Sequence, residues 1–179
     1  MSYFEEIREK SRALKNPFCI GIDPHIELFD GFLKQEFVNL GTKRFLEAFC
    51  DAHLRAAQNS VSAVKFQSSF FESFGVDGLS VLKDALIKCR TFGIQSILDA
   101  KRGDISSTMQ AYGRAAFEYY GADCLTVNLY MGVEVVEALL PWLKKGKGIY
   151  LVWYPSNTGS SEFDFLKIKT QAKKFLYEE

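Results

Sequence analysis

The sequence predicts an α/β protein, namely a (β/α)8 TIM barrel of which the chain covers about five βα units. Short apolar runs alternate with segments of helical periodicity, and this alternation requires a parallel sheet. Polar residues stand where four successive strands pass into their loops: Asp23, Lys65, Asp99 with Lys101, and Asn128. Barrels gather side chains from successive strand ends, whereas an open doubly wound sheet binds its ligand at one switch point. The sequence holds no G-x-G-x-x-G or P-loop motif, which also favours the barrel.

The expected elements follow one another in a regular order. Ser2 and Glu5 have the spacing of a capping box, which predicts an N-terminal helix rather than a signal peptide. Strands are predicted at residues 18–23, 61–66, 95–101, 124–128 and 148–153. Helices are predicted at residues 43–58, near 79–90, from Asp104 to Tyr120 and around Val133 to Leu143, with a last helical stretch after the loop at 155–161.

Composition indicates a single domain over residues 1–179, because no linker or low-complexity segment divides the chain. The 22 basic and 22 acidic residues balance, and without a basic run we expect no nucleic-acid partner. No apolar stretch approaches the length of a membrane span, so no membrane partner is expected.

Eight βα units would need about 250 residues. We therefore expect a domain truncated at its C-terminus, with a wide apolar edge and no activity as an isolated monomer.

Cysteines and histidines form neither a disulfide nor a metal pattern. The scattered cysteines lack C-x-x-C pairing, which predicts reduced core thiols and a cytoplasmic location. They are Cys19, Cys50, Cys89 and Cys124. His53 lies on an apolar helical stripe and is expected to pack there, whereas His25 is a minor candidate for contact with a substrate. Neither histidine has a partner at metal-ligand spacing, so no metal site is predicted.

Three charges cluster at the end of the third strand. Residues two apart on a strand share a face, so Asp99 and Lys101 are expected to project together. Gly103 then turns the chain and Asp104 opens the next helix. Such a pair can be a surface ion pair of little consequence, and Asp104 can be a simple helix cap. The position at the carboxyl end of a parallel strand favours catalysis.

These residues also resemble a known family. Asp99, Lys101, Asp104, Ile105 and Thr108 fit the D-x-K-x-x-D-I-x-x-T signature of orotidine 5′-monophosphate decarboxylases, closest to the longer bacterial-type branch. Further resemblance runs through four segments in the family's order, from about residue 16 to 163. They are Gly21-Ile22-Asp23-Pro24, Val64-Lys65-Phe66-Gln67, Thr126-Val127-Asn128 and Pro155-Ser156-Asn157-Thr158-Gly159.

The resemblance implies decarboxylation of the small molecule orotidine 5′-monophosphate to uridine 5′-monophosphate without a cofactor. Lys101 would stabilise the developing carbanion and donate a proton, with Asp99 beside the departing carboxylate. Lys65 would extend the alternating charges and bind the ribose. Asp104 and Thr108 would reach across a homodimer interface into a shared site. Two lysines balance two aspartates, so this cluster needs no metal for neutrality.

The remaining implied contacts concern the rest of the substrate. Asp23 would accept hydrogen bonds from ribose hydroxyls, and Ser156 would contact the pyrimidine amide, although a turn serine fits position 156 nearly as well. Asn128 and Gln67 are weaker candidates for ligand contact. The family's phosphate-binding loop has no counterpart in the sequence.

Other functions remain open at this stage. A sugar-phosphate decarboxylase or lyase on the same scaffold would use the acids to hold magnesium. A barrel aldolase would use Lys65 or Lys101 as a Schiff-base nucleophile, which neighbouring acids disfavour because they keep a lysine protonated. A third alternative is an inactive binding fragment.

Overall fold

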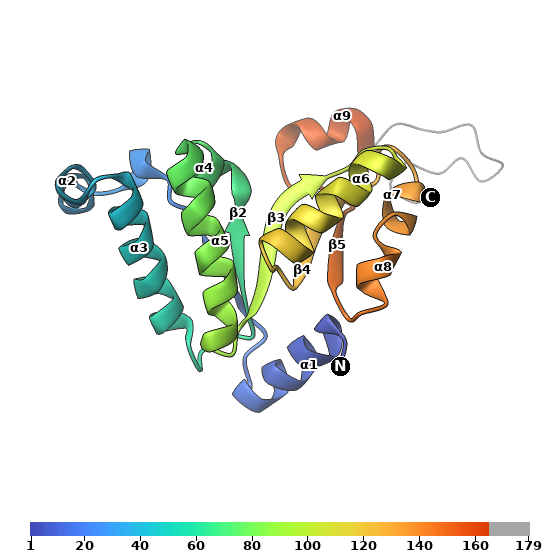
Figure 1. Cartoon of the computed structure of the whole chain (residues 1–179), viewed down its shortest axis with the longest axis horizontal. Helices are drawn as coiled ribbons and strands as arrows, with labels where there is room; N and C mark the ends of the chain where they lie inside the picture. The colour runs from blue at the N-terminus through green and yellow to red at the C-terminus, as the bar shows by residue number, and fades with distance from the viewer. Residues whose placement is uncertain (165–179) are drawn as a thin grey trace.

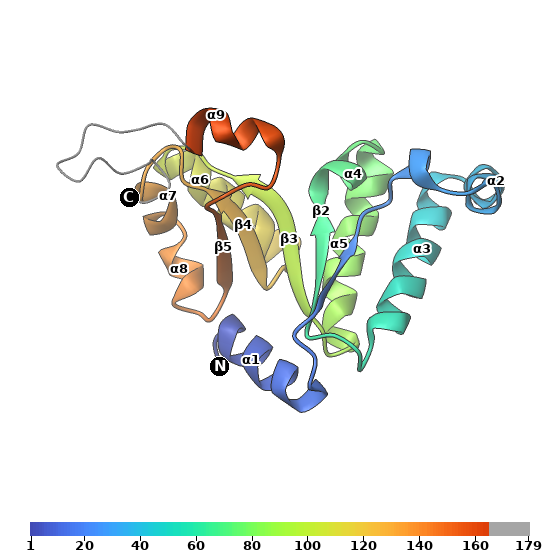
Figure 2. The ribbon, with the colours of Figure 1, turned by 180° about the vertical axis from the view of Figure 1, so that it is seen from behind.

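A computed structural model describes residues 1–164, which contain a parallel sheet of five strands in the order β1-β2-β3-β4-β5 (Figures 1 and 2). This uninterrupted order is that of part of a (β/α) barrel, and it lacks the reversal that defines a doubly wound sheet. Each strand pairs in parallel with the next. The strands are β1 (Cys19–Ile22), β2 (Ala63–Gln67), β3 (Gln95–Arg102), β4 (Cys124–Asn128) and β5 (Gly148–Val152).

Helices connect the strands and cover one face of the sheet. Figure 1 shows α5 and α6 in front of the strands, and Figure 2, from the opposite side, shows them behind the strands. The longer helices are α1 (Tyr3–Leu14), α2 (Gly31–Leu40), α3 (Thr42–Ala57), α5 (Gly75–Thr91) and α6 (Ser106–Gly113), which continues into the π-helix η2 (Arg114–Tyr119). The shorter ones are η1 (Ile26–Leu28), α4 (Ser68–Glu72), α7 (Glu134–Glu137), α8 (Leu140–Leu143), η3 (Thr158–Ser160) and α9 (Ser161–Asp164).

Strand alternation separates an apolar outer face from a polar inner face. Val64, Phe66 and Leu98 are buried in the main core between the sheet and the helices. Lys65, between Val64 and Phe66, and Asp99, next to Leu98, therefore project from the other face, toward what would be the inside of a barrel. The apolar core thus fixes the face on which the charged side chains gather.

Helix α1 closes the N-terminal ends of the strands. The Ser2–Glu5 capping box is present, which confirms the predicted start of this helix. Tyr3 donates its backbone N–H to the Gly146 carbonyl at 2.7 Å and is buried against Ala63, Ile97 and Cys124. A Cβ at Gly148 would lie 2.5 Å from the Tyr3 ring, so glycine is needed for this docking.

Helices α2 and α4 and the π-helix were not among the predicted elements. The first begins at the Asp30 N-cap, and α4 follows β2 without a loop. The predicted helix from Asp104 to Tyr120 starts at Ser106 with Ile105 as N-cap, so Asp104 precedes the helix rather than capping it. Most of the last predicted helical stretch lies outside the described residues.

The prediction of four core thiols is wrong for Cys19, which is exposed on the edge strand β1. Cys50, Cys89 and Cys124 are buried free thiols, and burial raises the pKa of each to about 12. His53 packs as predicted, with its ring 4.2 Å from that of Phe49. Within the described part of the chain, no helix combines the length and apolar character needed to cross a membrane.

The two outer strands each have one neighbour among residues 1–164. Large apolar side chains are exposed beside them, as expected for an open sheet. Phe18 precedes β1 with 70% of its surface exposed, and Trp153 follows β5 with 58% exposed.

Candidate active site

Side chains from three neighbouring strands meet at the carboxyl edge of the sheet. Asp23 follows β1, Lys65 lies on β2, and Asp99 and Lys101 lie on β3. These four residues, here called the Lys–Asp tetrad, alternate in charge across the inner face. All four residues were predicted from the sequence, and the structure brings them together.

Asp99 is the centre of the tetrad and accepts hydrogen bonds on both carboxylate oxygens. Lys101 Nζ donates to Oδ1 at 2.7 Å, and Lys65 Nζ donates to Oδ2 at 3.0 Å. The Thr126 hydroxyl donates to Oδ1 at 2.8 Å, and Gln67 Nε2 donates to Oδ2 at 3.2 Å. Each oxygen therefore binds one ammonium and one neutral donor, and the carboxylate is held in a single orientation.

Burial and hydrogen bonding act in opposite directions on Asp99. The residue is 5% exposed, and this burial raises the pKa of its carboxyl group. Hydrogen bonds from Lys101, Lys65 and Thr126 lower the pKa by more, so the net pKa lies below the ordinary value of an aspartate. Asp99 is therefore ionised at neutral pH, as a buried charge with two cationic partners can be.

The chain reaches this geometry through a bulge rather than through plain alternation. Leu98 pairs with Leu125 and Arg102 with Val127, so β3 has three residues opposite the single residue Thr126 of β4. Lys101 takes the left-handed backbone conformation, with φ of 45°. A lysine in this region is strained, and such strain concentrates at functional sites. The predicted contact of Asp99 with Lys101 is confirmed. The bulge, and not plain strand alternation, sets the directions of the two side chains.

Asp23 extends the tetrad toward β1. Its Oδ1 accepts the backbone N–H of Gln67 at 3.3 Å and lies 3.9 Å from Lys65 Nζ. Lys65 is thus placed between two carboxylates, closer to Asp99 than to Asp23. Among the described residues, no group of three or more His, Cys, Asp or Glu side chains is arranged to hold a metal ion.

Four other predicted site residues do not contact the tetrad within residues 1–164. Asp104 accepts the N–H of Ile105 at 2.7 Å, and Thr108 lies half-buried on α6. Asn128 shapes its own loop by accepting the N–H of Tyr130 at 2.9 Å. Ser156 is exposed in the loop after β5.

Gly103 sets the path of the chain between Lys101 and Asp104. A Cβ at this position would lie 2.3 Å from the Asn128 carbonyl oxygen, which is far inside van der Waals contact. Only glycine lets the loop after β3 pass so close to the end of β4. The glycine of the D-x-K-x-x-D segment is therefore a packing requirement.

Thr126 is a site residue that sequence reasoning passed over, and Gln67 was given little weight. Both face the same side of the sheet as Asp99, and both follow the period of two along their strands. A polar residue inside an otherwise apolar strand was the available signal for Thr126. Only the bulge in the neighbouring strand makes its hydroxyl the partner of Asp99.

The sequential parallel sheet and its charged carboxyl edge define a protein of the βα-barrel class. The model of the orotidine 5′-phosphate decarboxylase / HUMPS family matches residues 16–178, and the chain belongs to this family. An orotidine 5′-phosphate decarboxylase of Roseiflexus sp. (strain RS-1) is 37% identical over 169 residues. That of Janthinobacterium sp. (strain Marseille) is 32% identical over 169 residues.

Coverage of these relatives is partial. Each of the two alignments covers 94% of this chain, but only 58% and 59% of the respective relatives. The structure of Leishmania donovani OMP decarboxylase superposes with a TM-score of 0.76 at 28% identity, over 99% of this chain and 62% of that one. Leishmania donovani UMP synthase gives a TM-score of 0.80 at 27% identity, over 99% of this chain and 35% of that one.

Proposed function

We propose that the protein containing this sequence decarboxylates orotidine 5′-monophosphate to uridine 5′-monophosphate. The observation that carries the proposal is the buried Asp99 carboxylate held between the ammonium groups of Lys101 and Lys65 at 2.7 and 3.0 Å. The relatives named orotidine 5′-phosphate decarboxylase support the same reaction and substrate.

Lys101 supplies the main chemistry. When the bond from C6 of the pyrimidine to the carboxylate breaks, carbon dioxide leaves and the electron pair remains on C6. This carbanion is not delocalised into the ring π system, so its stabilisation must be electrostatic. The Lys101 ammonium stabilises the charge and then donates a proton to C6, which completes the product. No electron is gained from or lost to a redox partner.

The other tetrad residues position Lys101 and the substrate. Asp99 orients Lys101 and lies beside the departing carboxylate. Lys65 and Asp23 bind the ribose hydroxyls from the β1 and β2 side of the site. We assign the pyrimidine amide to Ser156, in the loop after β5, and a secondary ligand contact to Asn128, the last residue of β4.

We further infer a homodimer with shared sites, located in the cytoplasm. Asp104 lies beyond the Gly103 turn and Thr108 lies on the helix that follows, so both can serve a neighbouring subunit's site. Buried free thiols at three of the four cysteines agree with a reducing compartment. Residues 1–179 are assigned to one barrel domain, in which each outer strand of the sheet has one neighbour among residues 1–164.

The test is a decarboxylation assay on the natural full-length protein. The protein should continue to consume orotidine 5′-monophosphate and to release carbon dioxide after exhaustive chelation with EDTA. Loss of activity with EDTA and recovery with magnesium would instead assign the protein to the sugar-phosphate lyases. Absence of turnover under both conditions would support an inactive binding protein.

A further inference from the structure

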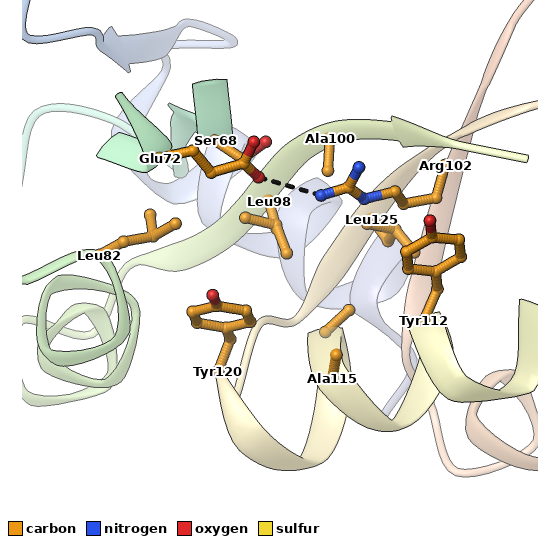
Figure 3. A pocket seen from close by; sticks show the side chains of 11 residues that line it. Ser68, Glu72, Leu82, Leu98, Ala100, Arg102, Tyr112, Ala115, Tyr120 and Leu125 are labelled. Carbon is orange, nitrogen blue, oxygen red and sulfur yellow. Dashed lines mark hydrogen bonds and ion pairs between the residues drawn. The ribbon is translucent and has the colours of Figure 1, made fainter. Parts of the chain in front are cut away.

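A cavity of about 180 Å³ lies on the outer face of β3, behind the Lys–Asp tetrad. Figure 3 shows the space enclosed by side chains from α4, α5, β3 and the α6–η2 segment. Its floor is apolar and consists of Leu82, Leu98 and Leu125. This β3 outer cavity shares no lining residue with the tetrad, because successive strand residues point to opposite faces.

Small side chains and a wide helical turn keep the cavity open. Ala100 on β3 and Ala115 on η2 stand at its wall, where larger side chains would fill it. The backbone N–H of Tyr120 donates to the Ala115 carbonyl at 2.9 Å, five residues back, as in a π-helix. Such π segments are rare and occur frequently at functional sites.

The mouth of the cavity presents donors beside acceptors. Arg102 Nη2 donates to Glu72 Oε1 at 3.0 Å, and the guanidinium lies 4.9 Å from the centre of the Tyr112 ring. Glu72 and Arg102 are 41% and 35% exposed in their side chains, so both can bind a further polar group. Figure 3 shows this ion pair spanning the rim above the apolar floor.

Tyr120 adds a hydroxyl donor at the same mouth. Burial raises its pKa, and the nearby Tyr119 and Glu72 raise it further, so the phenol stays protonated at neutral pH. A ligand that matches this mouth must offer a carbonyl to Arg102 or Tyr120 and an N–H to Glu72. A lactam, the cyclic amide with N–H next to C=O, offers both on one edge.

Volume and shape limit the ligand to a single ring. A dry apolar cavity of about 150 Å³ accommodates benzene, and the β3 outer cavity is slightly larger. We propose that the β3 outer cavity is a second small-molecule site, which binds a planar six-membered lactam ring with its C–H edge on the leucine floor. Ala100 and Arg102 flank Lys101 in sequence, so a bound ring contacts the strand segment that carries the bulge. The proposal does not depend on the proposed function.

The probe is 2-pyridone, titrated into the full chain and followed by the backbone amide signals of residues 100–102 and 115–120 in ¹⁵N–¹H spectra. We expect saturable shifts at these residues. N-methyl-2-pyridone, which lacks the N–H, should bind at least tenfold more weakly. Equal binding of the two compounds, or absence of saturable shifts with 2-pyridone, would overturn the proposal.

Variants locate the binding. Ala115→Leu should fill the cavity and weaken 2-pyridone at least tenfold, whereas Ala52→Leu, the same change at an exposed position of α3, should leave affinity unchanged. Glu72→Ala changes an exposed residue and should weaken binding without loss of the fold. The Lys101→Ala variant should retain full affinity for 2-pyridone. Loss of affinity in this variant would place the ligand at the Lys–Asp tetrad and refute the proposed site.

Discussion

Thr126 on β4 holds Asp99 on β3 by a hydrogen bond of 2.8 Å from its hydroxyl to Oδ1. The same hydroxyl oxygen accepts the backbone N–H of Lys101 at 2.9 Å. Because the bulge takes this N–H out of the regular ladder, one threonine replaces a strand-pairing bond and orients a buried carboxylate.

Thr126→Val should therefore impair both stability and turnover. Loss of the hydroxyl leaves the backbone N–H of Lys101 without its partner and removes one of the two donors to Asp99 Oδ1, at a cost of about 1–3 kcal/mol in the free energy of unfolding. In the full-length protein, kcat should fall more than KM rises, because the change misorients Asp99 and Lys101. Thr126→Ser should retain most activity, and Thr91→Val at the exposed end of α5 is the matched control. Equal loss of activity in the Thr126→Ser and Thr126→Val variants would show that the Thr126 hydroxyl does not position Asp99 and Lys101.

Lys101→Ala should abolish turnover while product binding changes little, since the ammonium acts mainly in the transition state. We expect kcat below a tenth of the wild-type value, a barrier increase of more than about 1.4 kcal/mol. Steady-state kinetics and calorimetric product binding measure the two effects, with Lys43→Ala at an exposed position as control. A higher residual kcat would exclude Lys101 as proton donor, and borohydride trapping of a substrate adduct would favour an aldolase.

Asp99 should make stability dependent on pH in the acidic range. Its folded-state pKa lies below the unfolded value, so the unfolded chain binds more protons between the two and stability rises with pH there. This contribution is present above the unfolded pKa and is lost as pH falls through the folded pKa. Urea unfolding between pH 6 and roughly pH 3 should show a shallower slope for Asp99→Asn than for wild type. Asp84→Asn, an exposed control, should keep the wild-type slope.

The shared-site proposal predicts complementation between two inactive variants. Asp104→Ala and Lys101→Ala subunits, each nearly inactive alone, should regain activity when mixed. In a mixed dimer with shared sites, one site contains both substitutions and the other site contains neither, so the second site is intact. Random pairing makes about half of the dimers mixed, so activity should approach about a quarter of wild type. Subunit exchange is verified by mass spectrometry of labelled chains. Exchange without recovery would assign Asp104 to its own subunit's site.

Local sequence patterns were sufficient for the parallel sheet and for the tetrad. The period of two within β2 and β3 separates Lys65 and Asp99 from the apolar residues of the core, and this separation is readable from the order of residues alone. The positions of β4 and its end at Asn128 were predicted correctly for the same reason. Helix α4 was missed because its five residues are too few to show a helical period. Helix α2 was missed because none of its ten residues is buried, so its apolar side chains do not mark one core-facing stripe.

Only the tertiary structure decided how the site is held and what lies behind it. The bulge at Lys101, the Thr126 hydrogen bonds and the close pass of Gly103 over Asn128 each depend on two strands meeting in one register. The β3 outer cavity likewise depends on alanines from β3 and η2, which are distant in sequence, facing the same space. Strand periodicity is a property of neighbouring residues, whereas register and packing arise from contacts between segments far apart in the chain, which a linear pattern does not encode.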